Sequence, residues 1–234
     1  MIAGLQKMTL LDYPGKVACT VFLQGCNYAC PFCHNSSLLS FEAEPFMEED
    51  ALLAFLQKRQ GVLDGVCITG GEPTLTPGLE NLLGHIKALG YAVKLDTNGS
   101  RPEVLRHLAE EKLLDYVAMD VKNGPSAYAA TTGVPGLKLE KVEESLRFLI
   151  GGSIPYELRT TLVQQLHDEA SIAEMGRWLQ SLVPEKKPAV LYLQRFVDRE
   201  SVAFSGLSAP DTAQIQRFSQ LLSPFVQQVC IRGE

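Results

Sequence analysis

Residues 16–33 read KVACTVFLQGCNYACPFC and combine two patterns. The first eight residues are mostly apolar and include β-branched side chains, which predicts a strand over 16–23. The rest holds three thiols, Cys26, Cys30 and Cys33, at a C-x₃-C-x₂-C spacing. A strand that runs into a cysteine-rich loop predicts a site at the carboxyl end of that strand.

The rest of the chain alternates such strand patterns with helical patterns. Strands are expected over 16–23, 65–69, 91–96, 115–121, 155–163 and 189–196, with a closing strand over 225–231. Helices are expected over 48–60, 78–89, from 102, and over 141–149, 168–182 and 211–222. This alternation implies right-handed crossovers and a parallel sheet. Six such units are fewer than the eight of a full barrel. The prediction is therefore an α/β fold, a partial (β/α)6 TIM-like barrel, with one domain over 1–234 and an N-terminal extension over 1–15.

The composition narrows the functional classes. The chain has 234 residues, 46% of them hydrophobic and 21% charged, as in ordinary globular proteins. The net charge is −6 and no basic stripe is present, which argues against a nucleic-acid partner. The start lacks the apolar core of a signal peptide, and no apolar run reaches the length of a membrane span. We expect a cytoplasmic protein with no membrane partner, in which clustered cysteines indicate a metal or catalysis rather than disulfides.

The three clustered cysteines fit an iron–sulfur cluster better than zinc. Structural zinc takes four ligands, and His34 is too close to Cys33 to complete a tetrahedron comfortably. Cys19 and Cys67 fall inside strand patterns, where free cysteine is usually a buried apolar residue, and Cys230 is far away in sequence. A [4Fe–4S] cluster needs one thiolate on each iron unless another group binds there. Three cysteines would leave one iron open to a bidentate small molecule.

Further polar and glycine residues fall at or just past the ends of the other predicted strands. They are Gly70, Gly71 and Glu72 after the second strand, Asp96 after the third, Asp120 and Lys122 after the fourth, and Arg195 after the sixth. In parallel α/β folds these ends converge on the ligand. The glycines would let backbone approach a ligand closely, and Glu72 could pair with an ammonium group. Plain structural alternatives remain open, namely a tight turn at the glycines and a salt bridge between Asp120 and Lys122.

The cysteine motif, with Phe32 before its last cysteine and the TGGEP sequence at 69–73, resembles the signature of radical S-adenosylmethionine (SAM) enzymes. The resemblance implies that Cys26, Cys30 and Cys33 bind three irons of a [4Fe–4S] cluster and that the amino and carboxylate groups of SAM chelate the fourth. An electron from the cluster would cleave the sulfonium, and the resulting 5′-deoxyadenosyl radical would abstract a hydrogen atom. The protein would supply orientation and water exclusion. Phe32 is a candidate for the adenine contact, or else packs under the cluster.

The remaining strand ends also match this resemblance. It implies that the Gly-Gly-Glu sequence, with Glu72, contacts the SAM amino group. In glycyl-radical activating enzymes an Asp-Thr-Asn-Gly and an Asp-x-Lys line the SAM site, sometimes through a monovalent cation; Asp96, Asp120 and Lys122 match these positions. Arg195 stands where family members place a segment near the adenine base, sometimes with a histidine, so its contact with the ribose remains open.

The opening sequence, GLQKMTLLDYPGK at 4–16, together with FLQGC, YELRTT and LYLQRF, resembles activating proteins of anaerobic ribonucleoside-triphosphate reductase across nearly the whole chain. These proteins are similar to pyruvate formate-lyase activating enzyme. The resemblance implies a glycyl-radical enzyme as protein substrate and a flavodoxin or ferredoxin-type electron donor. The alternatives are a pyruvate formate-lyase-type activase, an enzyme acting on a small molecule such as a 7-carboxy-7-deazaguanine synthase, and a nonenzymatic electron carrier. A carrier normally fills all four ligand positions. Residues 11–16 either lie beside the barrel mouth, where a glycine loop would enter, or cover the opposite end.

Overall fold

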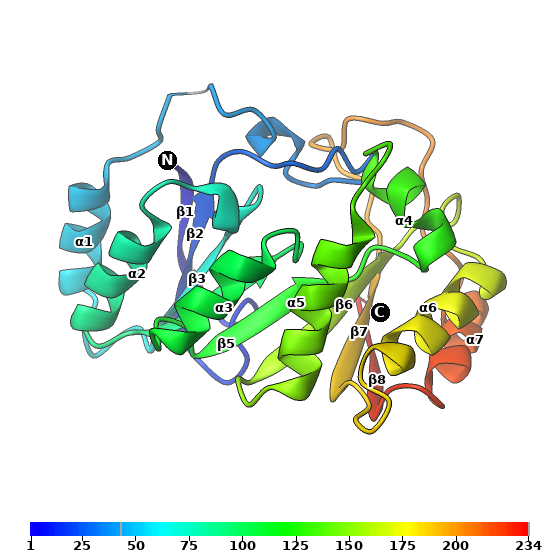
Figure 1. Cartoon of the computed structure of the whole chain (residues 1–234). Coiled ribbons are helices and arrows are strands. Elements are labelled where there is room, and N and C mark those ends of the chain that lie inside the picture. The colour runs from blue at the N-terminus through cyan, green and yellow to red at the C-terminus, as the bar shows by residue number, and fades with distance from the viewer. Residues whose placement is uncertain (43, 234) are drawn as a thin grey trace. The chain divides into compact units, whose positions relative to one another are not determined.

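The structure, a computed structural model, describes residues 1–42 and 44–233. Helices alternate with strands, and the strands form an eight-stranded sheet in chain order from β1 to β8 (Figure 1). The chain forms two compact units. The first unit comprises Met1–Asn27, Ser37–Thr97 and Glu103–Ala118, and the second comprises Tyr28–Ser36, Asn98–Pro102 and Met119–Glu234. The predicted site residues are therefore divided between the two units.

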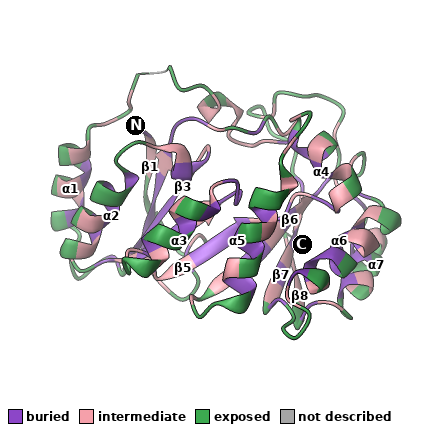
Figure 2. Cartoon of the chain, viewed as in Figure 1, coloured by how far each residue is buried: buried purple, intermediate pink, exposed green. Residues whose placement is uncertain are grey.

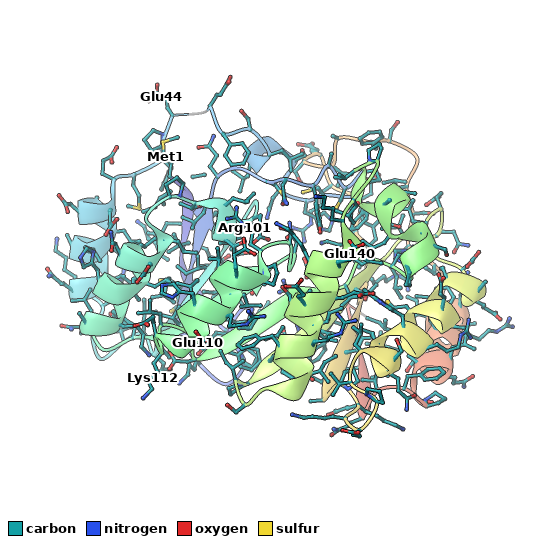
Figure 3. All side chains as sticks on the ribbon, in the orientation of Figure 1. Met1, Glu44, Arg101, Glu110, Lys112 and Glu140 are labelled. Atoms are coloured by element: carbon teal, nitrogen blue, oxygen red, sulfur yellow. The ribbon has the colours of Figure 1, made fainter. Side chains whose placement is uncertain are left out.

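The first unit is built on strands whose β-branched and aliphatic residues are buried. Its strands are β1 (Ile2–Thr9), β2 (Ala18–Leu23), β3 (Gly65–Gly70), β4 (Ala92–Thr97) and most of β5 (Tyr116–Asp120). Strand β1 is antiparallel to β2, whereas β2, β3 and β4 are parallel. The intervening helices are η1 (Ser36–Leu38), α1 (Glu49–Gln57), η2 (Pro73–Leu75), α2 (Leu79–Ala88) and α3 (Pro102–Glu110). Figure 3 shows all described side chains, with Glu110 and Lys112 marking the end of α3.

The second unit continues the alternation. Its strands are the end of β5, then β6 (Tyr156–Leu162), β7 (Val190–Arg195) and β8 (Gln228–Arg232), and the last three are parallel. Its helices are α4 (Pro125–Thr132), α5 (Leu139–Gly151), α6 (Glu169–Leu182) and α7 (Thr212–Leu222). Helix starts follow local sequence signals. Asp168 and Ser171 form a capping box at α6, and Asp211 accepts a 2.7 Å bond from the Gln214 N–H at α7.

Burial follows the expected division between strands and helices. Strand residues such as Val66 and Val93 are fully buried, and so are helix residues such as Leu83 and Leu179. Figure 2 shows that the helices have both buried and exposed faces. Outer helix faces are exposed. The α/β class with a mostly parallel sheet is confirmed, including the closing strand. The structure adds β1 and α4, which the sequence patterns did not predict.

The segment after β1 lies at the amino ends of the strands. Thr9 pairs with Ala18, the first residue of β2. The ring of Tyr13 is 2% exposed and lies 6.1 Å from the ring of Tyr116, the first residue of β5. A Cβ on Gly65, the first residue of β3, would lie 3.0 Å from Tyr13. The structure therefore contradicts the hypothesis that residues 11–16 stand at the carboxyl ends of these strands. It supports the alternative, in which they cover the opposite ends.

Among residues 1–42 and 44–233, no helix combines the length and the apolar character needed to cross a lipid bilayer.

Candidate functional site

Residues 24–36 form a segment that we call the cysteine loop. Its first cysteine, Cys26, belongs to the first unit, where backbone hydrogen bonds hold it. The Gly25 N–H donates to the Leu38 carbonyl at 2.8 Å, and the Cys26 N–H donates to the Leu39 carbonyl at 3.2 Å. The carbonyl of Gly25 also accepts from the Glu72 N–H at 2.7 Å. The position of Cys26 is thus tied to the Gly-Gly-Glu sequence that follows β3.

The two glycines of that sequence allow this contact. Gly70 has a φ of +123°, and a Cβ there would collide with the backbone of Leu23. A Cβ on Gly71 would collide with the carbonyl of Gly25, while the Gly71 N–H donates to the Leu23 carbonyl at 2.8 Å. Only glycine fits such close backbone approach. The close approach seen here is to the chain's own backbone, and it places the Gly-Gly-Glu sequence beside the start of the cysteine loop.

Glu72 is fully buried, and its carboxylate caps η2. Its Oε1 accepts from the Thr74 N–H at 3.1 Å, from the Thr74 hydroxyl, and from the Thr97 hydroxyl at 2.8 Å. A carboxylate offers about four acceptor positions on its two oxygens, and these bonds all use Oε1. The orientation of Glu72 is therefore fixed by the ends of β3 and β4.

Asp96 lies near the end of β4 and pairs with a buried lysine on the same strand. Lys94 is 1% exposed, and its ammonium forms an ion pair with the Asp96 Oδ1. The Cys67 thiol lies 3.8 Å from the Lys94 ammonium and 3.7 Å from the same carboxylate oxygen. Residues two apart on a strand share a face, so Lys94 and Asp96 point to the same side. Asp96 was a candidate site residue from the sequence, and Lys94 was not.

Cys30 and Cys33 lie in the second unit, in the remainder of the cysteine loop. The Cys33 N–H donates to the Cys30 carbonyl at 3.1 Å, which forms a turn. The Ala29 N–H donates to the carbonyl of Thr132, at the end of α4, at 2.9 Å. Helix α4, which was not predicted, therefore anchors the loop just before Cys30.

Phe32 packs inside the second unit. It is 5% exposed and contacts Val163, after β6, and Phe196, after β7. The Lys122 ammonium lies 5.9 Å from the centre of its ring, within the range of a cation–π interaction. These contacts favour the packing alternative for Phe32.

Asp120 and Lys122 form a three-residue ion-pair group with Arg159. The Asp120 carboxylate accepts from Lys122 and from Arg159, each at 2.9 Å. Burial alone raises the pKa of this carboxyl group. The charges and hydrogen bonds of Arg159 and Lys122 outweigh that effect and hold the pKa well below its ordinary value. Asp120 is therefore an anion between two cations.

His167 is bonded to the backbone of this ion-pair group. It is 1% exposed; its Nδ1 accepts from the Val163 N–H at 3.1 Å, and its Nε2 donates to the Lys122 carbonyl at 2.9 Å. Burial lowers its pKa, so the neutral ring is favoured. The structural role of His167 is to fix the backbone at Lys122.

The Arg195 side chain is bonded at the start of α7. Its guanidinium donates to the Thr212 hydroxyl, at the start of α7, at 3.4 Å. The described contacts do not bring Arg195 to the Asp120 group. The backbone that follows it does approach the cysteine loop, because the rings of His34 and Phe196 stack with centres 5.5 Å apart. His34 also bonds the Val197 carbonyl at 2.7 Å.

The cysteines fit a [4Fe–4S] cluster by the chemistry of their donors. All six cysteines are free thiols, and burial raises the pKa of Cys19 to about 12, which suits a core residue rather than a ligand. Burial also raises the pKa of Cys30, and the nearby Lys122 charge opposes that rise and favours the thiolate. In the described part of the chain, no three His, Cys, Asp or Glu side chains are close enough to hold a single metal ion. Cluster thiolates bind different irons and therefore stand further apart.

Residues 20–174 match the family model of the radical SAM superfamily, so the chain belongs to that superfamily. Radical SAM enzymes use a [4Fe–4S] cluster and SAM, and this chain is a radical SAM enzyme. The matched residues include the cysteine loop, the Gly-Gly-Glu sequence, Asp96 and the Asp120 group.

Two relatives differ in how much of the chain they share. The "Putative glycyl-radical enzyme activating enzyme MJ1227" of Methanocaldococcus jannaschii is 29% identical over 245 residues, covering 99% of this chain and 95% of that protein. The 7-carboxy-7-deazaguanine synthase of Thermococcus kodakarensis is 30% identical over 155 residues, covering 58% of this chain and 59% of that protein. The first likeness spans the whole chain, and the second spans about three-fifths of it.

A solved structure confirms the class of fold. The structure titled "Native anSMEcpe with bound AdoMet" has a TM-score of 0.64 and 16% identity, and the match covers 90% of this chain and 61% of that one. The partial TIM-like barrel predicted from the sequence agrees with this likeness.

Proposed function

We propose that this chain activates a glycyl-radical enzyme, by abstracting a hydrogen atom from a backbone glycine of that partner protein. The observation that carries the proposal is the end-to-end likeness to the activating enzyme of M. jannaschii. The match to the small-molecule synthase covers 58% of this chain. The match to the activating enzyme covers 99% of this chain, so it includes parts that the synthase match leaves out.

When bound, the [4Fe–4S] cluster and SAM supply the hydrogen abstraction, and the chain supplies their binding and orientation. We assign Cys26, Cys30 and Cys33 to the three irons. Phe32 would line the cysteine loop as a packed apolar residue. The contact of Phe32 with Val163 and Phe196 helps to exclude water from this loop.

The carboxylates are proposed to differ in the part of SAM that they meet, because their bonded neighbours differ in charge. Glu72 accepts from hydroxyl and N–H donors that carry no charge of their own, so a Glu72 carboxylate suits the SAM ammonium. Asp96 is paired with one cation, Lys94, which suits neutral ribose hydroxyls. Asp120 holds two cations, and their surplus positive charge suits the SAM carboxylate.

The partner is proposed to be anaerobic ribonucleoside-triphosphate reductase, with pyruvate formate-lyase-like enzymes second. This choice is supported by the sequence resemblance at 4–16 and along the chain. A flavodoxin or ferredoxin-type protein is proposed as the electron donor.

The test is anaerobic incubation of the reconstituted chain with SAM, a reductant and each candidate partner. We expect an electron paramagnetic resonance doublet from a glycyl radical on the partner, at the expense of SAM. The matched controls are the Cys30→Ala chain and a partner whose target glycine is replaced by alanine. A chain that cleaves SAM but gives no doublet on any candidate, and that turns over SAM in proportion to a small molecule, would overturn the activase proposal.

A further inference from the structure

Lys94 is an unusual residue for the middle of a buried strand. It is 1% exposed, although a lysine is almost never fully buried unless its charge is paired. Its cross-strand neighbour on β3 is Cys67, whose own neighbour on β2 is Thr20. Cys67 is buried, and Thr20 donates its hydroxyl to Asp12. Lys94 thus sits in a buried row of small, mostly uncharged side chains.

The Lys94 ammonium is directed along its own strand toward the predicted site. Among the described residues its bonded carboxylate is Asp96, two residues nearer the carboxyl end of β4, and the Cys67 sulfur lies 3.8 Å away. A lysine ammonium is a compact point charge with three donors and no acceptor. The Lys94 ammonium balances the charge of Asp96 and fixes the position of the Asp96 Oδ1. Because Lys94 is buried, water does not compete for this ion pair.

The second unit shows the same arrangement independently. Asp120 accepts from the Lys122 ammonium and the Arg159 guanidinium, each at 2.9 Å. Each of the two aspartates therefore has at least one positively charged partner within its own unit.

We propose that Lys94 is a built-in counter-cation that positions Asp96, so that this enzyme binds SAM without an alkali metal ion. The proposal rests on the proposed site roles of Asp96 and Asp120. A monovalent cation, which the family resemblance allowed, does not fit these aspartates well. An alkali ion needs several oxygen ligands, whereas an ammonium already occupies the Asp96 oxygen and two cations already hold Asp120. A further cation beside them would be repelled.

The first experiment uses the wild-type chain, reconstituted anaerobically and exchanged into choline chloride. Sodium, potassium or lithium chloride replaces choline at constant ionic strength, because screening would otherwise change the result. SAM affinity is measured by equilibrium dialysis, and the thermal midpoint of the cluster-free chain is measured alongside. We expect each alkali ion to change SAM affinity by less than about twofold. A saturable increase of about tenfold or more with any of these ions would overturn the proposal.

The second experiment tests whether Lys94 is the reason that SAM binding is independent of alkali ions. Lys94→Met removes the ammonium and keeps an unbranched apolar side chain of similar length. We expect it to lose about tenfold in SAM affinity in choline, and to recover part of the loss as sodium or potassium saturates. The sodium NMR line width of the cluster-free variant should broaden at the same concentrations. Lys87→Met is the matched control, because it removes a lysine paired with Asp115 on the partly exposed side of the same unit. It should remain independent of alkali ions.

The outcomes separate this inference from the proposed function, because no partner protein is present in either assay. If Lys94→Met folds and binds SAM as tightly as the wild type in choline, Lys94 does not position Asp96 and the inference fails. If Lys94→Met does not fold, the variant Lys94→Met with Asp96→Asn removes both charges and avoids a lone buried carboxylate. That double variant should fold and show no alkali dependence, whereas alkali-stimulated SAM binding in it would contradict the assignment to Asp96.

Discussion

Replacing Glu72 by glutamine separates the two roles that the structure suggests for this side chain. Glu72 is fully buried, and its Oε1 accepts from the Thr74 N–H at 3.1 Å and from the Thr97 hydroxyl at 2.8 Å. A glutamine has the same length and keeps a carbonyl oxygen that can accept these bonds. Glu72→Gln therefore removes the negative charge proposed to meet the SAM ammonium while leaving the cap of η2 in place.

The expected magnitudes follow from these bonds. A hydrogen bond to a charged group contributes about 1.5–3 kcal/mol, so the glutamine variant should bind SAM about ten- to a hundredfold more weakly. Its free energy of unfolding should stay within about 1 kcal/mol of the wild type, because the buried donors keep an acceptor. Glu72→Ala removes the acceptor as well. Each buried donor left without a partner costs about 1–3 kcal/mol, so the alanine variant should also be less stable.

The assay combines three measurements on each reconstituted variant: iron per chain, SAM affinity by equilibrium dialysis, and urea unfolding. Thr97→Val is the matched control, since it removes one bond to Glu72 and leaves the charge. It should lose stability but keep most of its SAM affinity. A glutamine variant that carries a full cluster and binds SAM like the wild type would refute the role of the Glu72 charge. A glutamine variant as unstable as the alanine variant would refute the account of the cap.

Three further outcomes are expected. Cys30→Ala should abolish the stable cluster of about four irons, whereas Cys230→Ser should retain it. Iron and sulfide analysis of both variants is the measurement, and the reverse result would overturn the ligand assignment. Tyr13→Ala should lower the free energy of unfolding by about 3–5 kcal/mol and should reduce SAM cleavage and partner activation together. The control Leu11→Ala, at an 87% exposed position, should change the free energy of unfolding by less than about 0.5 kcal/mol. Loss of partner activation alone in the Tyr13 variant would restore a docking role for this segment. His167 has a folded-state pKa below its ordinary 6.5, so its contribution to stability is complete above about pH 6.5 and is lost as the pH falls toward the lowered value. Urea unfolding should therefore show that the stability difference between wild type and His167→Gln shrinks on acidification, and a difference that grew instead would contradict burial of the neutral ring.

The strands and helices were largely predictable because their patterns arise from local chemistry. Strands β2 to β7 are buried runs that are locally distinct from the amphipathic helices between them. Strand β1, read as an extension, carries glycine, glutamine and lysine in IAGLQKMT and lacks a strand pattern. It forms because β2 offers an open edge for antiparallel pairing, which is a tertiary effect. Helix α4 is short, and its apolar residues show little helical periodicity.

The sequence motifs could be found without the structure, but the side chains and backbone groups that bond to the candidate residues could not. The cysteine spacing indicated the proposed cluster ligands, and the strand ends indicated the proposed site carboxylates. Lys94 was missed because a lysine inside a strand pattern is normally read as an exposed position, although its spacing of two from Asp96 placed both on one face. His167 gave no signal, because its partners are the backbone groups of Val163 and Lys122, distant or unremarkable in sequence. The glycines at 70 and 71 were expected to let backbone approach a ligand, whereas the approach that the structure shows is to the backbone of β2 and of the cysteine loop.

The three proposed site carboxylates each have bonded partners within their own unit, and these partners decide what a substitution there reports. Glu72 accepts from the Thr97 hydroxyl, Asp96 pairs with Lys94, and Asp120 pairs with Lys122 and Arg159. Removing such a carboxylate leaves its buried partners unsatisfied, so a loss of SAM binding in an alanine variant reports on folding as much as on contact. The charge of each group is therefore the quantity to vary, with shape kept constant. Glutamine at Glu72 should weaken SAM with little loss of stability, whereas asparagine at Asp120 should leave two cations without their anion and destabilise the second unit. The sign of that contrast follows from the bonded partners alone, and a stable Asp120→Asn variant would show that Lys122 and Arg159 do not depend on this carboxylate.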